Sequence, residues 1–332
     1  MRKLTVILGA GASVSSGLPS LGGIFADEAV MRYLKSDGLP FLKFLEQFVW
    51  SPRQIGESDR WKGLNLEEVL TMLRLWENDD QSPLNWKKNR SFQKHLLGCV
   101  YNSVFVDKSN IECGDYSQLI LLADEQFDHI TWASFNWDTK LEEGFLSAFP
   151  AFSTSEQLPS CSPSPVNWPG INQKHLFLKL HGSVSWFANS SGMIIHKGSF
   201  FERSNREIAD SWNDFLENGR GLVPMIAEPS FFKHERIKGV SFLRRQWRRF
   251  HAELGQSDVI LVVGYSLPDG DAMAKQALLT AVARNQNVRV WVVDPDQSGQ
   301  VESRYVRIFG RQRLHACNQE LAHFLLQRPA LL

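Results

Sequence analysis

A glycine-rich segment directly after the first apolar run constrains the fold of this chain more than any other feature. The apolar residues Leu4–Leu8 are followed by the small residues Gly9–Ser13 and then by Ser16–Pro19, which contains a further glycine. Glycine lets the backbone approach a bound group closely, and free N–H groups at a helix start attract an anion. The dinucleotide-binding fingerprint has glycine at its sixth position, where this chain has Val14. Alone, the segment is equally compatible with a phosphate-binding loop and with a tight turn.

Five short apolar segments alternate with helical patterns, which is typical of an α/β fold. They cover residues 3–8, 129–135, 176–180, 258–264 and 288–294. The last two segments are almost continuously apolar, as expected for strands of a parallel sheet with both faces covered. Between them, residues 272–284 are rich in alanine and leucine and predict a helix. We therefore predict a Rossmann-like, doubly wound parallel sheet.

The remaining stretches predict inserts in one large domain that covers residues 1–300. Residues 24–128 carry Trp, Phe and Leu at helical spacing and predict a helical insert subdomain. Residues 187–240 are polar and predict a smaller, irregular insert. Residues 150–173 are rich in serine and proline and predict a long loop, either a plain connector or a functional segment. For residues 301–332 we expect a C-terminal helical tail.

Charge and cysteine content argue against several classes of protein. The chain has 36 basic and 36 acidic residues, so no net field attracts it to nucleic acid or to an anionic membrane. Its four cysteines include no C-x-x-C pair, which argues against a disulfide scaffold and a zinc ribbon. No apolar run approaches the about 20 residues that span a bilayer, and the first strand begins too early for a secretory signal. We expect a cytoplasmic protein without a metal site.

Three polar residues follow predicted strands, where open α/β sheets bind their ligands. His181 follows the third apolar segment and precedes Gly182, which would leave space beside the ring. A histidine at this place is either a general base near neutral pH or a structural residue. Asn136 and Asp138 follow the second segment. They are candidate site residues, or else serve the next helix, Asn136 as its cap and Asp138 through the helix dipole.

The order of these motifs resembles that of the SIR2 family, the sirtuins, which have a GAGxSxxSGIP loop, an Asn-x-Asp segment and a His-Gly pair. The matching segments here are Gly9–Pro19, Asn136–Asp138 and His181–Gly182. Within the family, the chain is more similar to the bacterial SIR2-like branch that acts in antiphage defence. The segments that resemble that branch are Val263–Asp271 (its GYSLPDxD element), Val292–Asp296 (its ribose-binding turn) and Asn65–Leu70 (its helical insert). The resemblance spans most of residues 3–297.

The resemblance implies a sirtuin-like fold and an NAD+ glycohydrolase that releases nicotinamide and ADP-ribose. NAD is then the substrate. Asn136 would orient a water or a ribose hydroxyl, His181 would polarise it, and Asp138 matches the second polar residue of the family motif. The residues that would bind NAD are Gly9, Ala10, Gly11, Ser13, Gly17, Pro19, Gly264, Ser266 and Asp294. Ser266 and Asp294 are equally compatible with a turn hydroxyl and a strand-ending Asp-Pro.

Two departures from the protein deacylases of the family favour hydrolysis of NAD. Sirtuins usually read Pro-Asp-Phe-Arg after the glycine loop, where this chain reads Pro19–Gly22, and typical deacylases hold a structural zinc with two cysteine pairs that this chain lacks. An NAD-dependent protein deacylase is one alternative. The other is a module that senses NAD or ADP-ribose without turnover, although a pure sensor would need neither Asn136 nor His181.

The resemblance also implies a means of control, because an unrestrained NAD hydrolase would kill its host. The sequence contains no obvious sensor domain, so we expect homo-oligomerisation or a separate regulatory protein, such as an ATPase or an Argonaute-type partner. One basic stretch, residues 242–254, carries apolar residues at helical spacing with arginines mostly elsewhere. It predicts an amphipathic helix that covers the sheet, or else a weak contact with a phosphate backbone or a partner.

Overall fold

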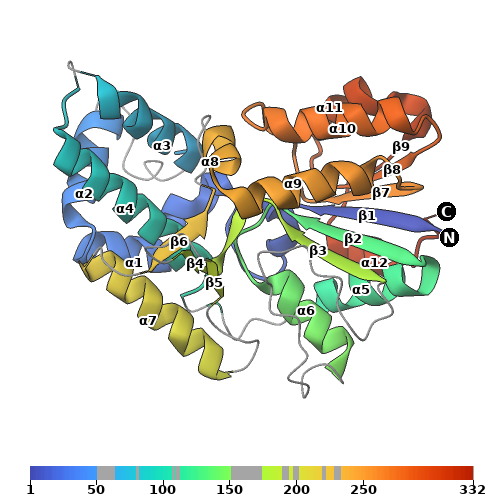
Figure 1. The fold of residues 1–332 in the computed structure, drawn as a ribbon, viewed down its shortest axis with the longest axis horizontal. Helices are drawn as coiled ribbons and strands as arrows, with labels where there is room; N and C mark the ends of the chain where they lie inside the picture. Colours follow the sequence, from blue (N-terminus) through green and yellow to red (C-terminus); the bar gives the residue numbers. More distant parts are fainter. Residues whose placement is uncertain are drawn as a thin grey trace.

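The computed structural model describes residues 1–50, 64–79, 82–106, 108, 113–150, 174–188, 194–196, 202–218, 222–227 and 233–331. A six-stranded sheet with the order β3-β2-β1-β7-β8-β9 forms its centre (Figure 1). The strands are β1 (Lys3–Leu8), β2 (His129–Ser134), β3 (His175–Lys179), β7 (Val259–Val263), β8 (Arg289–Val293) and β9 (Leu314–Cys317). Every neighbouring pair is parallel. The strand order changes direction between β1 and β7, and this switch point is where open α/β sheets bind ligands.

Helices cover both faces of the sheet, which explains why its strands are so uniformly apolar. One face packs against α9 (Ser241–Leu254), α10 (Ala272–Arg284) and α11 (Gln300–Phe309), and the other against α5 (Gly114–Gln126), α6 (Lys140–Ala148) and α12 (Leu321–Leu326) (Figure 1). All five residues of β7 are buried between these layers. The predicted doubly wound Rossmann-like sheet is therefore confirmed.

The basic stretch forms α9 and packs as the amphipathic pattern predicts. Phe242, Leu243, Trp247, Phe250 and Leu254 are buried in the core between this helix and the sheet. The arginines of the helix are exposed on its opposite side. The apolar spacing is thus explained by packing on the sheet.

A second layer of helices lies beside the sheet and has its own hydrophobic core. It consists of α1 (Glu28–Ser36), α2 (Leu39–Phe44), α3 (Leu66–Leu75), α4 (Trp86–Val104) and α7 (Glu202–Asn218) (Figure 1). The Asn65 side chain caps α3 by accepting a hydrogen bond from the backbone N–H of Glu67 at 2.9 Å. Within the predicted insert of residues 24–128, α5 differs from α1–α4 because its buried residues join the core of the sheet.

Regular elements also occupy much of the stretch 187–240 that we expected to be irregular. A small antiparallel sheet has the order β5-β4-β6, built from β4 (Gly182–Ala188), β5 (Ile194–His196) and β6 (Val223–Ile226). The helices α7 and α8 (Lys233–Gly239) lie in the same stretch. These elements are hard to recognise in the sequence because the strands are short and because few of the described side chains of α7 are buried, among them Ile208 and Trp212. The predicted serine- and proline-rich loop lies almost entirely outside the described residues.

The C-terminal segment differs from the helical tail that we expected, because it completes the main sheet. It contains most of α11 and all of α12, but between them β9 pairs in parallel with β8. β9 is a four-residue edge strand, Leu314–Cys317, without a fully buried residue. Such a strand carries too little apolar pattern to be recognised in the sequence. In the described part of the chain, no helix is both long and apolar enough to span a membrane.

We expect Phe324→Ala to lower the free energy of unfolding by about 3–4 kcal/mol, the usual cost of truncating a core phenylalanine. Phe324 on α12 is 1% exposed and lies 6.2 Å from Trp291 of β8, measured between ring centroids. Leu326→Ala on the same helix is the matched control, since Leu326 is 77% exposed. Urea denaturation of both variants measures the difference. Equal stabilities would contradict the integration of the C-terminal segment into the core.

Candidate active site

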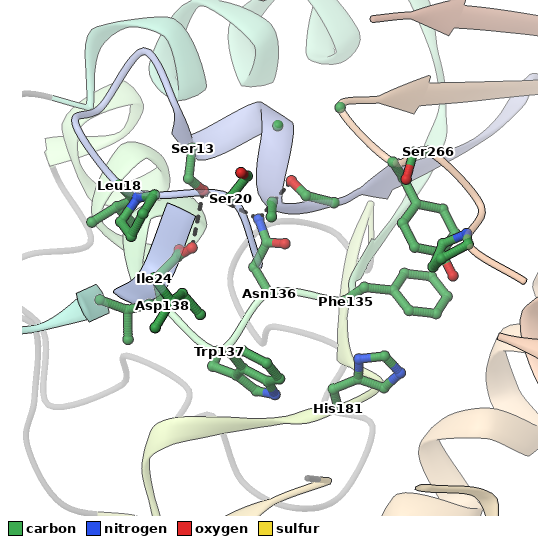
Figure 2. A pocket seen from close by; sticks show the side chains of 18 of the residues that line it. Ser13, Leu18, Ser20, Ile24, Phe135, Asn136, Trp137, Asp138, His181 and Ser266 are labelled. Carbon is green, nitrogen blue, oxygen red and sulfur yellow. Dashed lines mark hydrogen bonds between the residues drawn. The ribbon is translucent and has the colours of Figure 1, made fainter. Parts of the chain in front are cut away.

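A cavity of about 360 Å³ lies where β1, β2 and β7 end, next to the switch point of the sheet (Figure 2). Its walls include loops of the main sheet together with Ile24 and Val104 of the helical layer. The predicted site residues that line it are Gly9, Ala10, Gly11, Ser13, Pro19, Asn136, Asp138, His181, Gly264, Ser266 and Asp294. Gly17 does not line the cavity and instead adopts a left-handed conformation, φ 67°, in the turn before Leu18. Residues from distant parts of the sequence thus converge on one site.

The glycines after β1 bring two backbone segments together at the switch point. The N–H of Gly9 donates to the carbonyl of Val263, and that of Gly11 to the carbonyl of Gly264. A Cβ on Gly9 would lie 2.5 Å from the Gly264 oxygen, and one on Gly11 would lie 2.8 Å from the Gly264 Cα. We predicted that these glycines admit a ligand. In the structure, they allow the backbone of the loop after β1 to pack directly against the backbone of the loop after β7.

Ser13 holds Asn136 in place at the edge of the cavity. The Asn136 amide nitrogen donates to the Gly9 carbonyl at 2.9 Å and to the Ser13 hydroxyl oxygen at 3.1 Å. The Ser13 hydroxyl is also 2.9 Å from Asp138 Oδ2 and 2.8 Å from the Tyr116 hydroxyl. With its nitrogen fixed in this way, Asn136 has its amide oxygen left to meet a ligand. Ser13, which we predicted to contact the ligand directly, is saturated by protein partners.

Asp138 is held by its neighbours on both carboxylate oxygens. Oδ2 accepts from Ser13, and Oδ1 accepts from the Lys140 backbone N–H at 2.9 Å, at the start of α6. The Lys179 ammonium group donates to the Asp138 carbonyl. The cap position of α6 is occupied by Thr139, so Asn136 is not the helix cap. Asp138 therefore fixes the Ser13 hydroxyl, which in turn holds Asn136.

His181 is buried at the cavity wall with one nitrogen unpartnered. Its ring meets Phe135 edge-on, 5.0 Å apart and at 88°, and forms a hydrogen bond with the Phe135 backbone. Nε2 has no hydrogen-bond partner among the described residues and lies 3.8 Å from Asp271 Oδ1. Burial lowers the pKa of His181 to about 4, with Asp271 opposing the shift and Lys233 adding to it. The imidazole is therefore neutral at pH 7 and can accept a proton.

Gly182 allows a close backbone approach next to His181. Its φ is 80°, and a Cβ there would overlap the Met225 carbonyl oxygen on β6. The adjoining His181 carbonyl accepts a hydrogen bond from the Ala227 N–H at 2.7 Å. The glycine thus allows β6 to pack against β4 where His181 enters the cavity.

Three buried charged residues near His181 were missed as functional candidates. Lys233 Nζ lies 2.6 Å from Asp271 Oδ1 and 3.0 Å from Glu67 Oε1. The Tyr265 hydroxyl donates to the other Asp271 oxygen at 2.6 Å. Asp271 and Glu67 lie within segments that resemble family motifs. Lys233, the first residue of α8, belongs to no motif in the sequence. The contacts of Lys233 with Asp271 and Glu67 arise only from the tertiary fold.

Ser266 and Asp294 lie near the ends of β7 and β8. Ser266 is exposed, and its carbonyl accepts a hydrogen bond from Arg304 at 2.9 Å. Burial raises the pKa of Asp294; a hydrogen bond from the Asp296 backbone opposes this shift, and the Asp296 charge adds to it. Asp294 Oδ1 also accepts from the Asp296 N–H at 3.1 Å. Both residues line the cavity. They follow β7 and β8, whereas Asn136 follows β2, on the other side of β1 in the sheet.

The fold and the cavity define an α/β protein with a ligand site at the switch point of its sheet. No protein-family model matches the sequence, and no curated protein matches it. Among solved structures, a mutant Sir2 homologue in complex with 2′-O-acetyl ADP ribose aligns with a TM-score of 0.51 at 14% identity, covering 98% of this chain and 90% of that chain. A Sir2 complex with a p53 peptide and NAD+ aligns with a TM-score of 0.41 at 14% identity, covering 98% and 91%. The first of these alignments shows that the chain has the Sir2, or sirtuin, fold.

Proposed function

We propose that this protein is an NAD+ glycohydrolase that cleaves the nicotinamide–ribose bond. The main support is the pairing of Asn136 with a neutral His181 whose Nε2 is unpartnered, in one cavity of a Sir2-type fold. General bases of this kind act by accepting a proton from a positioned water or hydroxyl.

The volume and the position of the cavity are compatible with NAD as the ligand. Its volume of about 360 Å³ lies within the range of small-molecule sites. Its position at the switch point is where Rossmann-type sheets hold dinucleotides. The Sir2 homologue with the TM-score of 0.51 was solved with an ADP-ribose derivative, which supports the same class of ligand. Asp294 and Ser266 would lie toward the adenosine half, and Asn136 and His181 toward the nicotinamide half.

The proposed reaction needs little acid catalysis at the leaving group. The nicotinamide ring of NAD is cationic and departs as a neutral molecule, through an oxocarbenium-like state similar to that of glycoside hydrolysis. The Asn136 amide oxygen would orient a water, and His181 Nε2 would take its proton. The water oxygen bonds to the ribose carbon as the bond to nicotinamide breaks. The products are nicotinamide and ADP-ribose.

We further propose that this activity depletes NAD during antiphage defence, under control by oligomerisation or by a regulatory protein. This role rests on the resemblance of the sequence to bacterial SIR2-like proteins. The test is to express the protein in bacteria, infect them with a panel of phages, and follow cellular NAD. A fall in NAD that requires both infection and Asn136 supports the role, and constant NAD under every infection contradicts it.

Product analysis separates hydrolysis from the two alternative activities. Purified protein is incubated with NAD, with and without an acetyl-lysine peptide, and the products are identified by mass spectrometry. We expect ADP-ribose and nicotinamide in both mixtures. Formation of O-acetyl-ADP-ribose only with the peptide would identify a deacylase instead. Binding of NAD without any product, at all protein concentrations that allow assembly, would favour a sensor.

A further inference from the structure

Three charged side chains are buried together beside the cavity, and two of them, Lys233 and Asp271, line it. Lys233 is 8% exposed, Glu67 6% and Asp271 4%. They come from α8, from α3 in the helical layer and from the segment before α10, so only the tertiary fold unites them. Buried charges are costly to desolvate, and an apolar cluster of similar size is often at least as stable. Their presence at this cavity therefore calls for a functional explanation.

The position of Asp271 creates a problem for a base at His181. Its Oδ1 lies 3.8 Å from His181 Nε2, the nitrogen that must keep a free electron pair. A buried carboxylate at this distance strongly favours a protonated imidazole. A protonated imidazole cannot accept a proton from water or from a ribose hydroxyl. Asp271 therefore opposes the effect of burial, which keeps the imidazole neutral.

Lys233 resolves this conflict because it binds the same carboxylate oxygen. Its ammonium group is 2.6 Å from Asp271 Oδ1 and opposes the field that the carboxylate exerts on the imidazole. Glu67 accepts from the same ammonium group at 3.0 Å and fixes it in place. The protonation state of His181 thus depends on a contact that reaches into the helical layer.

We propose that Lys233 acts with burial to keep His181 unprotonated at rest, and that Asp271 stabilises the imidazolium formed when His181 takes a proton during the reaction. Both are positioning residues that act through His181, with Glu67 as the anchor of Lys233. The proton moves from water to Nε2, and the Asp271 carboxylate compensates the resulting positive charge without accepting the proton. This proposal rests on the proposed function.

No other charged group in the described part of the chain faces the imidazole. The Phe135 ring covers one side, and Trp247 lies 6.5 Å away between ring centroids. Tyr265 lines the same cavity, but its hydroxyl donates to Asp271. Changes in the titration of His181 can therefore be attributed to Asp271 and Lys233.

The proposal predicts opposite effects for the two partners of the ion pair. In Lys233→Met the uncompensated carboxylate raises the pKa of His181, so the acid side of the pH–rate profile moves up by about one pH unit or more. In Asp271→Asn the profile does not move up, but the rate falls at every pH because the imidazolium loses its counterion. The double variant should lack the upward shift. Lys238→Met, an exposed lysine on the same helix, is the matched control.

The titration of His181 tests the proposal without reference to activity. Its ring signal in NMR spectra of histidine-labelled protein is assigned by comparison with His181→Gln and followed from pH 8 to pH 4.5. We expect the wild type to show only the beginning of a titration at the acid end of this range, and Lys233→Met to show a clear titration within it. Lys233→Gln removes the charge but keeps a donor for both carboxylates, and serves if the methionine variant does not fold. An unchanged titration in a folded, charge-free variant would overturn the proposal. The expected shift without NAD cleavage would instead contradict only the proposed function.

Discussion

Replacing His181 with glutamine is expected to slow NAD cleavage by about 10²–10⁴-fold, the usual contribution of a positioned general base. Glutamine fills similar space in the buried wall but cannot take the proton from the attacking water. NAD binding should change little, because the proposed role of His181 is at the reacting centre. Initial rates at saturating NAD, together with calorimetric titration of NAD, separate the two effects.

The pH dependence of the wild-type rate follows from the same residue. The lowered pKa of His181, about 4, means that the base is neutral across the physiological range. The rate should therefore stay level from about pH 8 to pH 5 and fall only as the pH drops through this pKa, because protonation removes the acceptor.

His251→Gln, on α9 outside the cavity, is the matched control for the His181 variant. A His181→Gln enzyme with more than about a tenth of wild-type activity would place the base elsewhere.

Gly264→Ala is expected to disrupt both the fold around the switch point and the binding of NAD. Gly264 has a φ of 57°, and a Cβ there would overlap the backbone of Gly11 and Ala12. Backbone cannot swing away as a flexible side chain does, so the loops after β1 and β7 must separate. We expect a loss of about 2–4 kcal/mol in the free energy of unfolding, since strain and overpacking act together.

Denaturation and NAD titration of the Gly264→Ala variant measure this effect. Gly114→Ala is the matched control, because nothing lies within 4 Å of a Cβ at Gly114, at the start of α5. The control should be neutral or slightly stabilising. A Gly264→Ala protein with wild-type stability and NAD affinity would contradict the tight packing of the two loops.

The sequence predicts the central sheet well because its strands are buried on both faces. The apolar runs at residues 3–8 and 258–264 coincide closely with β1 and β7, and the predicted helix 272–284 coincides with α10. The clustering of most predicted site residues follows from the same topology, since parallel strands place their carboxyl ends at one edge. The roles of these residues in NAD cleavage stay predictions.

Other features depend on tertiary contacts that leave no pattern in the sequence. β9 is a short edge strand whose side chains need not be apolar, so the C-terminal segment was expected to be helical. Lys233 becomes significant only because α8 brings it between Glu67 and Asp271. Ser13 and Gly182 fill places in the motif order, and the contacts of Ser13 with Asp138 and of Gly182 with β6 could not be read from that order.

Chromatography of NAD incubated with purified protein tests the central claim most directly. The account predicts that the wild type releases nicotinamide and ADP-ribose in equal amounts, whereas Asn136→Ala binds NAD and releases neither. The comparison isolates chemistry from binding, because Asn136 lines the cavity and its amide nitrogen is held in place by Gly9 and Ser13. Equal release by the wild type and by Asn136→Ala, or a wild type that neither binds nor cleaves NAD, would contradict the account.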